Sequence, residues 1–209
     1  KNYDTNEFQL EFYPQEFPGY GATDLRSPII ELEFADGSST TDFKYVKHKI
    51  YSGKHKLDGL PATYTENNSE AQTLEITLSD TIKNIDAILS FTVFDNYNAI
   101  TRSVKLINKS NHNIKIQRIL SASLDFKESN FEILHLSGAW ARECHIERMP
   151  LRKGTQSIES RRGASSHSQN PFIALVKPNV TENYGEVYAM SLVYSGNFLA
   201  NIEVDMYYS

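Results

Sequence analysis

The side chains best suited to bind a small polar molecule gather between residues 136 and 172. Trp140, the only tryptophan of the chain, follows Gly138 and precedes Arg142 in this stretch. Residues 160–172 then supply small, hydroxyl and amide side chains around His167, and such groups donate and accept hydrogen bonds. An indole ring can stack on the apolar C–H face of a pyranose while such neighbours reach its hydroxyl groups. The pattern predicts a site for a polyhydroxyl ligand, with Trp140 and His167 as candidate contact residues.

Two other interpretations of these residues stay open on sequence alone. Trp140 could be a core residue, because a lone tryptophan in a β-protein is usually largely buried. Residues 165–170 could form an ordinary solvated loop. The adjacent Ser166 and His167 do not predict a nucleophile and its base, since sequence neighbours rarely have that geometry and no nucleophile-elbow motif surrounds them.

Other catalytic or metal chemistry is not indicated. The six histidines lack metal-ligand spacing, and Cys144, as the only cysteine, excludes an internal disulfide and a cysteine-based zinc site. We interpret Cys144 as a packing or unreactive thiol. A glycosidase needs two facing carboxyl groups, and the 26 Asp and Glu residues do not single out such a pair. No catalytic residue, metal ligand or cofactor is predicted.

The composition limits which binding partners and which cellular compartment fit this chain. A net charge of -5 and a pI near 5.7 argue against nucleic acid and anionic membranes, which call for a basic face. No apolar run reaches the roughly 18 residues of a membrane-spanning helix. A lone cysteine fits a reducing, cytoplasmic location. The chain begins with Lys1 rather than Met and ends in a strand-like stretch, so we expect it to be a piece of a longer protein.

Alternating apolar and polar residues with short polar turns predict an all-β fold. Asp36 and Gly37 predict a hairpin between the strands at 29–34 and 42–45, and residues 195–197 predict another between those at 185–194 and 198–207. About a dozen strands are more than one open twisted sheet usually contains, so we expect an antiparallel sandwich of two packed sheets. Residues 136–172 are expected to form loops on this scaffold. The other expected strands cover residues 8–12, 47–51, 73–78, 85–94, 100–107, 114–124, 131–136 and 173–176.

Six segments, in order along nearly the whole chain, resemble the N-terminal domain of bacterial alpha-galactosidases of glycoside hydrolase family 36. They are GATDLRSP at 21–28, GLPATY at 59–64, ITRS at 100–103, LSGAWARE at 136–143, SRRGASSHSQNPF at 160–172 and VYSGNF at 193–198. One departure lies at Cys144, where relatives tend to carry arginine or a large aromatic residue.

The resemblance implies a β-supersandwich domain that precedes a (β/α)8 catalytic barrel. The full enzyme retains anomeric configuration and releases terminal alpha-linked galactose from melibiose- and raffinose-type sugars. The family's nucleophile and acid/base are aspartates of the barrel, so the resemblance places no catalytic residue in this chain. In the family, the tryptophan matching Trp140 reaches the galactose pocket. Family members are often tetramers joined partly through this domain, which implies a homo-oligomer with a large, partly apolar contact surface.

The sequence is thus interpreted as one N-terminal domain, residues 1–209, of an alpha-galactosidase. It contributes substrate contacts through Trp140 and His167 and contacts between subunits, but no catalytic carboxylate. The alternative is a carbohydrate-binding or purely structural β-sandwich without an enzymatic role.

Overall fold

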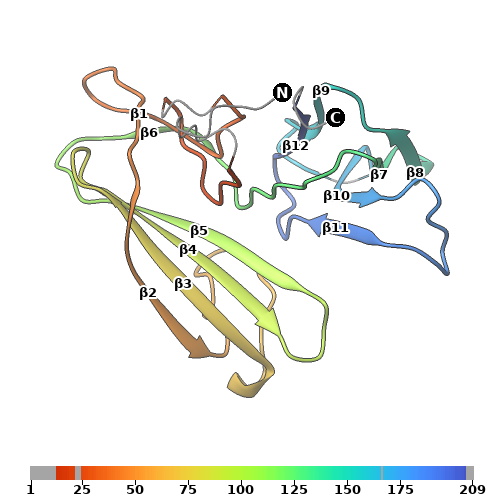
Figure 1. Cartoon of the computed structure of the whole chain (residues 1–209), viewed down its shortest axis with the longest axis horizontal. Helices are drawn as coiled ribbons and strands as arrows, with labels where there is room; N and C mark the ends of the chain where they lie inside the picture. The colour runs from red at the N-terminus through yellow and green to blue at the C-terminus, as the bar shows by residue number, and fades with distance from the viewer. Residues whose placement is uncertain (1–12, 22–24, 166, 206–209) are drawn as a thin grey trace, which may run out of the picture. The chain divides into compact units, whose positions relative to one another are not determined.

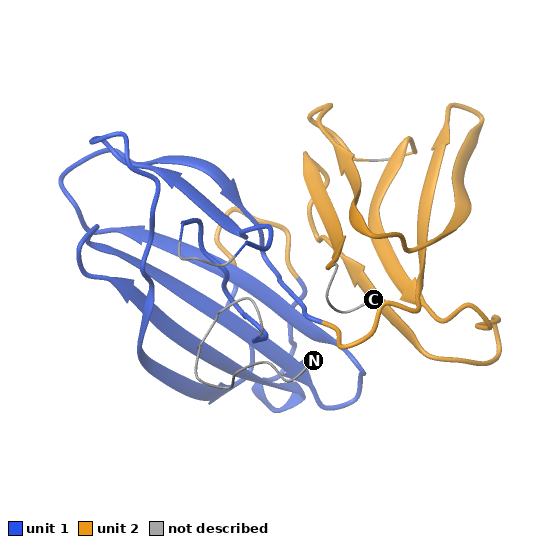
Figure 2. Ribbon diagram, turned by 45° about the horizontal axis from the view of Figure 1, so that its top comes forward, with its two compact units in different colours: residues 1–56, 63–125 blue, residues 57–62, 126–209 orange. Residues whose placement is uncertain are grey.

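A computed structural model of the chain describes residues 13–21, 25–165 and 167–205. It consists of antiparallel strands and a short 3₁₀-helix, η2 (Asn68–Glu70), and it divides into two compact units (Figures 1 and 2). Unit 1 comprises Lys1–Lys56 and Thr63–Asp125, and unit 2 comprises Leu57–Ala62 and Phe126–Ser209. The expected all-β fold with antiparallel sheets is confirmed. The single domain expected for residues 1–209 stays a prediction.

Unit 1 contains a long four-stranded sheet and a two-stranded sheet. The long sheet has the order β2-β3-β4-β5, and β1 pairs with β6. Ile30 and Leu32 of β1 are fully buried and pack with Ile85 of β4, so the unit's core lies between its two sheets. The strands are β1 (Ile30–Glu33), β2 (Lys44–Ser52), β3 (Ala71–Asp80), β4 (Ile85–Phe94), β5 (Ile100–Asn108) and β6 (Lys115–Ile119).

Unit 2 repeats this plan with different connections. A four-stranded sheet has the order β11-β10-β7-β8, and β12 pairs with β9. Ile133 and Ile173 from the larger sheet pack with Ile158 and Phe198 from the smaller one. The packing of two antiparallel sheets therefore occurs once in each unit. The strands are β7 (Glu132–Ala139), β8 (Arg142–Pro150), β9 (Gly154–Ser160), β10 (Gln169–Val176), β11 (Val187–Ser191) and β12 (Phe198–Val204).

Both predicted hairpins are wrong, although the predicted tight turn at Asp36 and Gly37 exists. Gly37 N–H donates to Phe34 O across a tight turn, but β1 then pairs with β6 and β2 pairs with β3. Residues 195–197 likewise join β11, which pairs with β10, to β12, which pairs with β9. Turn chemistry is local, whereas strand pairing depends on segments up to about 90 positions away, as in Ile30 opposite Ile119.

Residues 136–172 are mostly strand rather than loop. They hold all of β8 and β9 and parts of β7 and β10. The strand expected at residues 8–12 lies outside the described residues, as does the predicted end of the last strand. In the described part of the chain, no helix has the length and hydropathy needed to span a bilayer.

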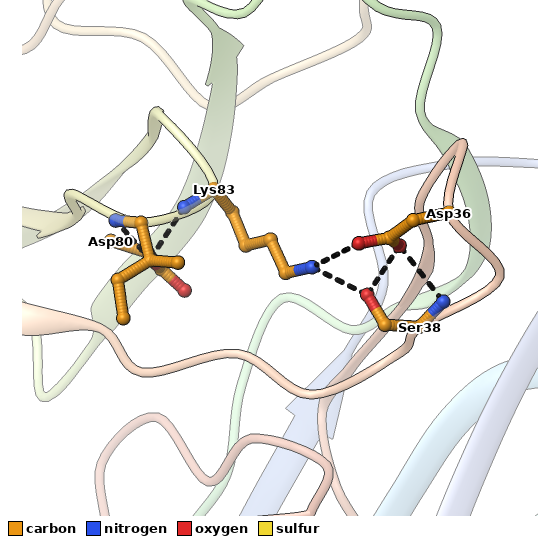
Figure 3. A network of polar contacts seen from close by, with 5 residues as sticks. Asp36, Ser38, Asp80 and Lys83 are labelled. Carbon is orange, nitrogen blue, oxygen red and sulfur yellow. Dashed lines mark hydrogen bonds and ion pairs between the residues drawn. The ribbon is translucent and has the colours of Figure 1, made fainter.

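A carboxylate at the end of β3 organises the turn into β4. Asp80 is 2% exposed, and its Oδ1 accepts the backbone N–H groups of Ile82 and Lys83, both at 2.9 Å. Its Oδ2 accepts the N–H of Asp42 at 2.8 Å, which ties the turn to the segment before β2. The Lys83 side chain reaches in the other direction, towards Asp36 (Figure 3).

Candidate functional site

Trp140 stands at the tip of the hairpin that joins β7 to β8. Ala139 pairs with Arg142, so Trp140 and Ala141 alone form the connection. Ala141 takes a left-handed φ of +63°, and its N–H donates to Glu143 Oε1 at 2.9 Å, which closes the turn. The Trp140 side chain is 86% exposed. Trp140 is therefore not part of this chain's hydrophobic core.

A β-bulge lies directly behind the tip. Ser137 opposes His145 while Ala139 opposes Arg142, so Gly138 alone faces both Glu143 and Cys144. A side-chain carbon at Gly138 would lie 2.2 Å from Arg142 O and 3.0 Å from His167 O, both of which are backbone atoms. Only glycine fits this close approach of three backbone segments. Cys144 takes a φ of +54° in the bulge and is exposed, so it does not pack in the core of this chain. That it is an unreactive thiol stays a prediction.

Three of the six segments that carry the family resemblance meet at this end of unit 2. Gly138 N–H donates to Ser168 O at 3.2 Å, joining the hairpin to residues 160–172. Ser165 N–H donates to Ser195 O at 2.8 Å, and Gly163 N–H donates to Asn197 Oδ1 at 2.7 Å. These bonds attach the same stretch to residues 193–198. The hairpin tip thus rises from a base made by two neighbouring loops.

His167 lies in this base. Its carbonyl oxygen is next to Gly138, two residues before Trp140, and its side chain is exposed. The structure therefore brings the backbones of the two predicted contact residues into one region of unit 2, although they are 27 positions apart. The neighbouring Arg162 donates to Ser168 Oγ at 3.2 Å.

Polar side chains continue from this region into the unit's interior, and sequence reasoning missed them. His135 and Ser137 on β7 are buried, and both contact Glu147 of β8: Ser137 Oγ donates to Oε1, and His135 Nε2 lies 3.8 Å from Oε2. His135 Nδ1 and Gln169 Oε1 are buried with no hydrogen-bond partner among the described residues. A buried polar atom without a partner costs about 1 to 3 kcal/mol, so these two atoms lower the stability of this end of the core. Their burial could have been predicted from the alternation of side chains along a strand, which places His135 and Ser137 on the same face as Ile133.

A cavity in unit 1, lined by Glu16, Arg102 and neighbouring apolar and serine residues, has a volume of about 10 Å³. That is room for about one water molecule and too little for a sugar ring. Within the described ranges, no three His, Cys, Asp or Glu side chains are grouped so that they could hold a metal ion. As the described residues form it, the candidate site is an exposed aromatic ring above a polar base.

Comparison with known proteins places this arrangement in a family. The model of the glycosyl hydrolase family 36 N-terminal domain matches residues 1–209. Alpha-galactosidase AgaA of Geobacillus stearothermophilus is 52% identical over 200 residues, which are 96% of this chain and 27% of that protein.

Solved structures give the same result. The crystal structure of the GH36 alpha-galactosidase AgaA matches with a TM-score of 0.94 and 51% identity, covering 96% of this chain and 28% of that one. A variant of AgaA in complex with raffinose matches with a TM-score of 0.94 and 50% identity, covering 100% of this chain and 29% of that one. The chain thus spans between a quarter and a third of the length of these relatives. Because the family model covers every residue and the fold agrees closely, the chain belongs to the glycosyl hydrolase family 36 N-terminal domain family.

Proposed function

We propose that this chain is the non-catalytic N-terminal domain of an alpha-galactosidase that releases terminal alpha-linked galactose from melibiose- and raffinose-type sugars. Trp140 and His167 contribute substrate contacts in the full-length enzyme. The observation that carries the proposal is the exposed Trp140 indole at the meeting point of three family segments. The relative crystallised with raffinose supports the choice of sugar. The exposed lone thiol of Cys144 supports a reducing, cytoplasmic location.

The physical role of Trp140 follows from its position. The two-residue turn restrains the backbone beneath the indole, while few protein atoms cover the ring itself. Such a ring can take the apolar face of a sugar with little loss of side-chain freedom, because tryptophan has only two side-chain torsions. His167 and the nearby hydroxyl groups can then donate to and accept from the sugar hydroxyls.

Replacing Trp140 by alanine in the full-length protein tests this role. A core tryptophan would cost about 3 to 5 kcal/mol of stability when truncated. We expect instead an almost unchanged melting temperature and a fall in kcat/KM for galactosides of roughly 5- to 150-fold, equivalent to about 1 to 3 kcal/mol. Melting and galactose release from raffinose should be measured side by side.

Tyr184→Ala is the matched control for this experiment. Tyr184 is also an aromatic residue of unit 2 and is 75% exposed, but it lies in the β10–β11 connection, at the opposite end of the same sheet from the Trp140 turn. It should change neither melting nor kinetics. A large drop in melting temperature for Trp140→Ala with normal kinetics would assign Trp140 to a buried interface and remove it from the site. Galactoside turnover absent from the unaltered full-length protein would refute the enzymatic role itself.

Subunit contact is the second part of the proposal. Strand β2 is an edge strand, and Tyr45, Val46 and Ile50 on it are 60%, 53% and 66% exposed. Exposed apolar side chains on an unpaired sheet edge are characteristic of surfaces covered by another chain. We assign this edge to a contact with a second copy in a homotetramer.

The mass of the full-length protein in solution tests the assembly. We expect a tetramer by light scattering and a smaller species for Ile50→Lys, because a charge would be buried in the contact. Ile82→Lys is the control, since Ile82 is 83% exposed but lies in the β3–β4 turn rather than on β2. A monomeric full-length protein would contradict the tetramer. An unchanged mass for Ile50→Lys would remove β2 from the contact.

A further inference from the structure

Two Asp-Gly pairs occur in the sequence, at Asp36-Gly37 and Asp58-Gly59. This pair is chemically unstable because glycine has no side chain to hinder attack by its own backbone nitrogen on the preceding carboxyl group. The glycine nitrogen bonds to the aspartate Cγ, and one side-chain oxygen leaves as water with the amide hydrogen and the carboxyl proton. One solvent water then opens the succinimide ring at the α-carbonyl and leaves a β-linked isoaspartate of unchanged mass.

The two pairs are closely matched in the features that usually decide this reaction. Both aspartates are exposed, and both glycines lie in turns with left-handed φ values, +78° for Gly37 and +73° for Gly59. No atom lies within 4 Å of the position that a side-chain carbon would take at either glycine. Exposure, local sequence and crowding therefore do not distinguish them.

Hydrogen bonding does distinguish them, and at Asp36 it restrains both reacting groups. Asp36 Oδ1 accepts from Ser38 N at 2.9 Å and from Ser38 Oγ at 2.6 Å, and Oδ2 accepts from Lys83 Nζ at 3.1 Å (Figure 3). The attacking nitrogen is engaged as well, since Gly37 N–H donates to Phe34 O at 2.9 Å. The Ser38 hydrogen bonds, followed by Lys83, hold the pKa of the Asp36 carboxyl well below its usual range. The protonated carboxyl, which is the form that loses water, is therefore rare.

Asp58 has none of these restraints. In the part of the chain that the structure describes, its carboxylate makes no hydrogen bond or ion pair, and the Gly59 N–H has no acceptor. The turn is closed only across its ends, by Leu60 N–H donating to Leu57 O at 3.2 Å. The carboxyl group and the nitrogen beside it are thus both free to approach each other.

We propose that Asp58-Gly59 is a site of spontaneous isomerisation to isoaspartate, and that the polar network around Asp36-Gly37 protects the second pair. Isomerisation at Asp58 adds a methylene group to the main chain inside a tight turn and turns the α-carboxyl into a side group. The product is a methyl acceptor for an L-isoaspartyl methyltransferase. This chemistry does not depend on the proposed galactosidase role.

The test is an incubation of the full-length protein at neutral pH and physiological temperature over several weeks. Samples are digested, and isoaspartate is located by electron-transfer fragmentation and by methyl transfer from S-adenosylmethionine with the methyltransferase. We expect isoaspartate to accumulate at residue 58 several-fold faster than at residue 36. In denaturant, where the network is lost, both pairs should react at similar rates.

Two variants separate the restraint from the local sequence. The double variant Ser38→Ala, Lys83→Met removes the two side-chain donors on the Asp36 carboxylate and leaves the backbone N–H groups of residues 37 and 38 in place. It should raise isomerisation at residue 36 above the rate in the unaltered protein, towards the rate at residue 58. Asp58→Glu should abolish the signal at 58, because glutamate would have to close a larger ring. Equal native rates at 36 and 58, or a native Asp58 that stays intact while the denatured protein reacts, would overturn the proposal. A double variant that melts normally yet leaves the rate at residue 36 unchanged would show that the Ser38 and Lys83 side chains do not protect Asp36, which would overturn that half of the proposal.

Discussion

The isolated 209-residue chain is expected to hydrolyse no alpha-galactoside, even when it is fully folded. Retaining hydrolysis needs one carboxylate as nucleophile and a second carboxyl group as acid and base, about 5 Å apart. The two glutamates nearest to Trp140 in the β8 sequence are both engaged structurally. Glu143 accepts the Ala141 N–H in the turn, and Glu147 accepts the Ser137 hydroxyl beside the buried His135. The proposed function places both catalytic groups in the part of the enzyme that this chain does not include.

The measurement is turnover of an aryl alpha-galactoside and of raffinose by the purified chain, with circular dichroism to verify the β-fold. The full-length protein serves as the positive control and should be active under the same conditions. We expect the chain alone to remain at the rate of the uncatalysed reaction, because both chemical steps are missing. Robust turnover by the folded chain would show that a catalytic pair lies within residues 1–209 and that the division of roles is wrong.

The sequence predicted well those strands that bury one face. The expected strand at 85–94 coincides with β4, and the expected strand at 73–78 lies within β3. Leu74, Ile76 and Leu78 are half-buried, but so are Glu75 and Thr77 between them. In these strands most apolar side chains are at least half-buried, so the run of apolar residues is enough to predict the strand.

The two strands that the sequence pattern did not predict, β8 and β9, carry few buried apolar side chains. β8 is an edge strand, exposed along almost its whole length, and β9 carries Ile158 as its only large apolar residue. β8 pairs with β7, and β9 pairs with β12, through backbone hydrogen bonds, which most residue types can make, and Ile158 adds one side chain to the core. A strand that buries little leaves no hydrophobic period, and therefore residues 136–172 were expected to be loops.

The candidate site was predictable in its residue types but not in its construction. An aromatic ring among small and hydroxyl side chains was enough to select Trp140 and His167. That a two-residue turn exposes the indole, and that Gly138 lets the His167 backbone approach the hairpin, depends on backbone geometry that no periodicity encodes. The buried polar atoms of His135 and Gln169 depend on the tertiary packing of β7 with β10.

Asp80→Ala is expected to cause the largest loss of stability among the variants considered. The substitution removes the acceptor of three backbone N–H groups at once, those of Asp42, Ile82 and Lys83. Hydrogen bonds to a charged group contribute about 1.5 to 3 kcal/mol each, and some donors can turn to water after the change. We therefore expect the free energy of unfolding to fall by about 4 kcal/mol. Because Asp80 is 2% exposed at the junction of β3 and β4, the loss should loosen the turn on which the long sheet depends.

Two companion variants show whether the carboxylate itself is responsible. Asp80→Asn keeps one carbonyl oxygen for Ile82 and Lys83 but presents an amide to the Asp42 N–H, so it should cost about half as much as the alanine variant. Asp95→Ala, in the exposed β4–β5 turn, should stay within about 0.5 kcal/mol of the unaltered chain. Denaturant unfolding gives the free energies, and hydrogen exchange should show lost protection at the three donor amides. If Asp80→Ala differed from Asp95→Ala by less than about 1 kcal/mol, or if the three amides stayed protected, Asp80 would not be the group that holds the two strands together at this turn.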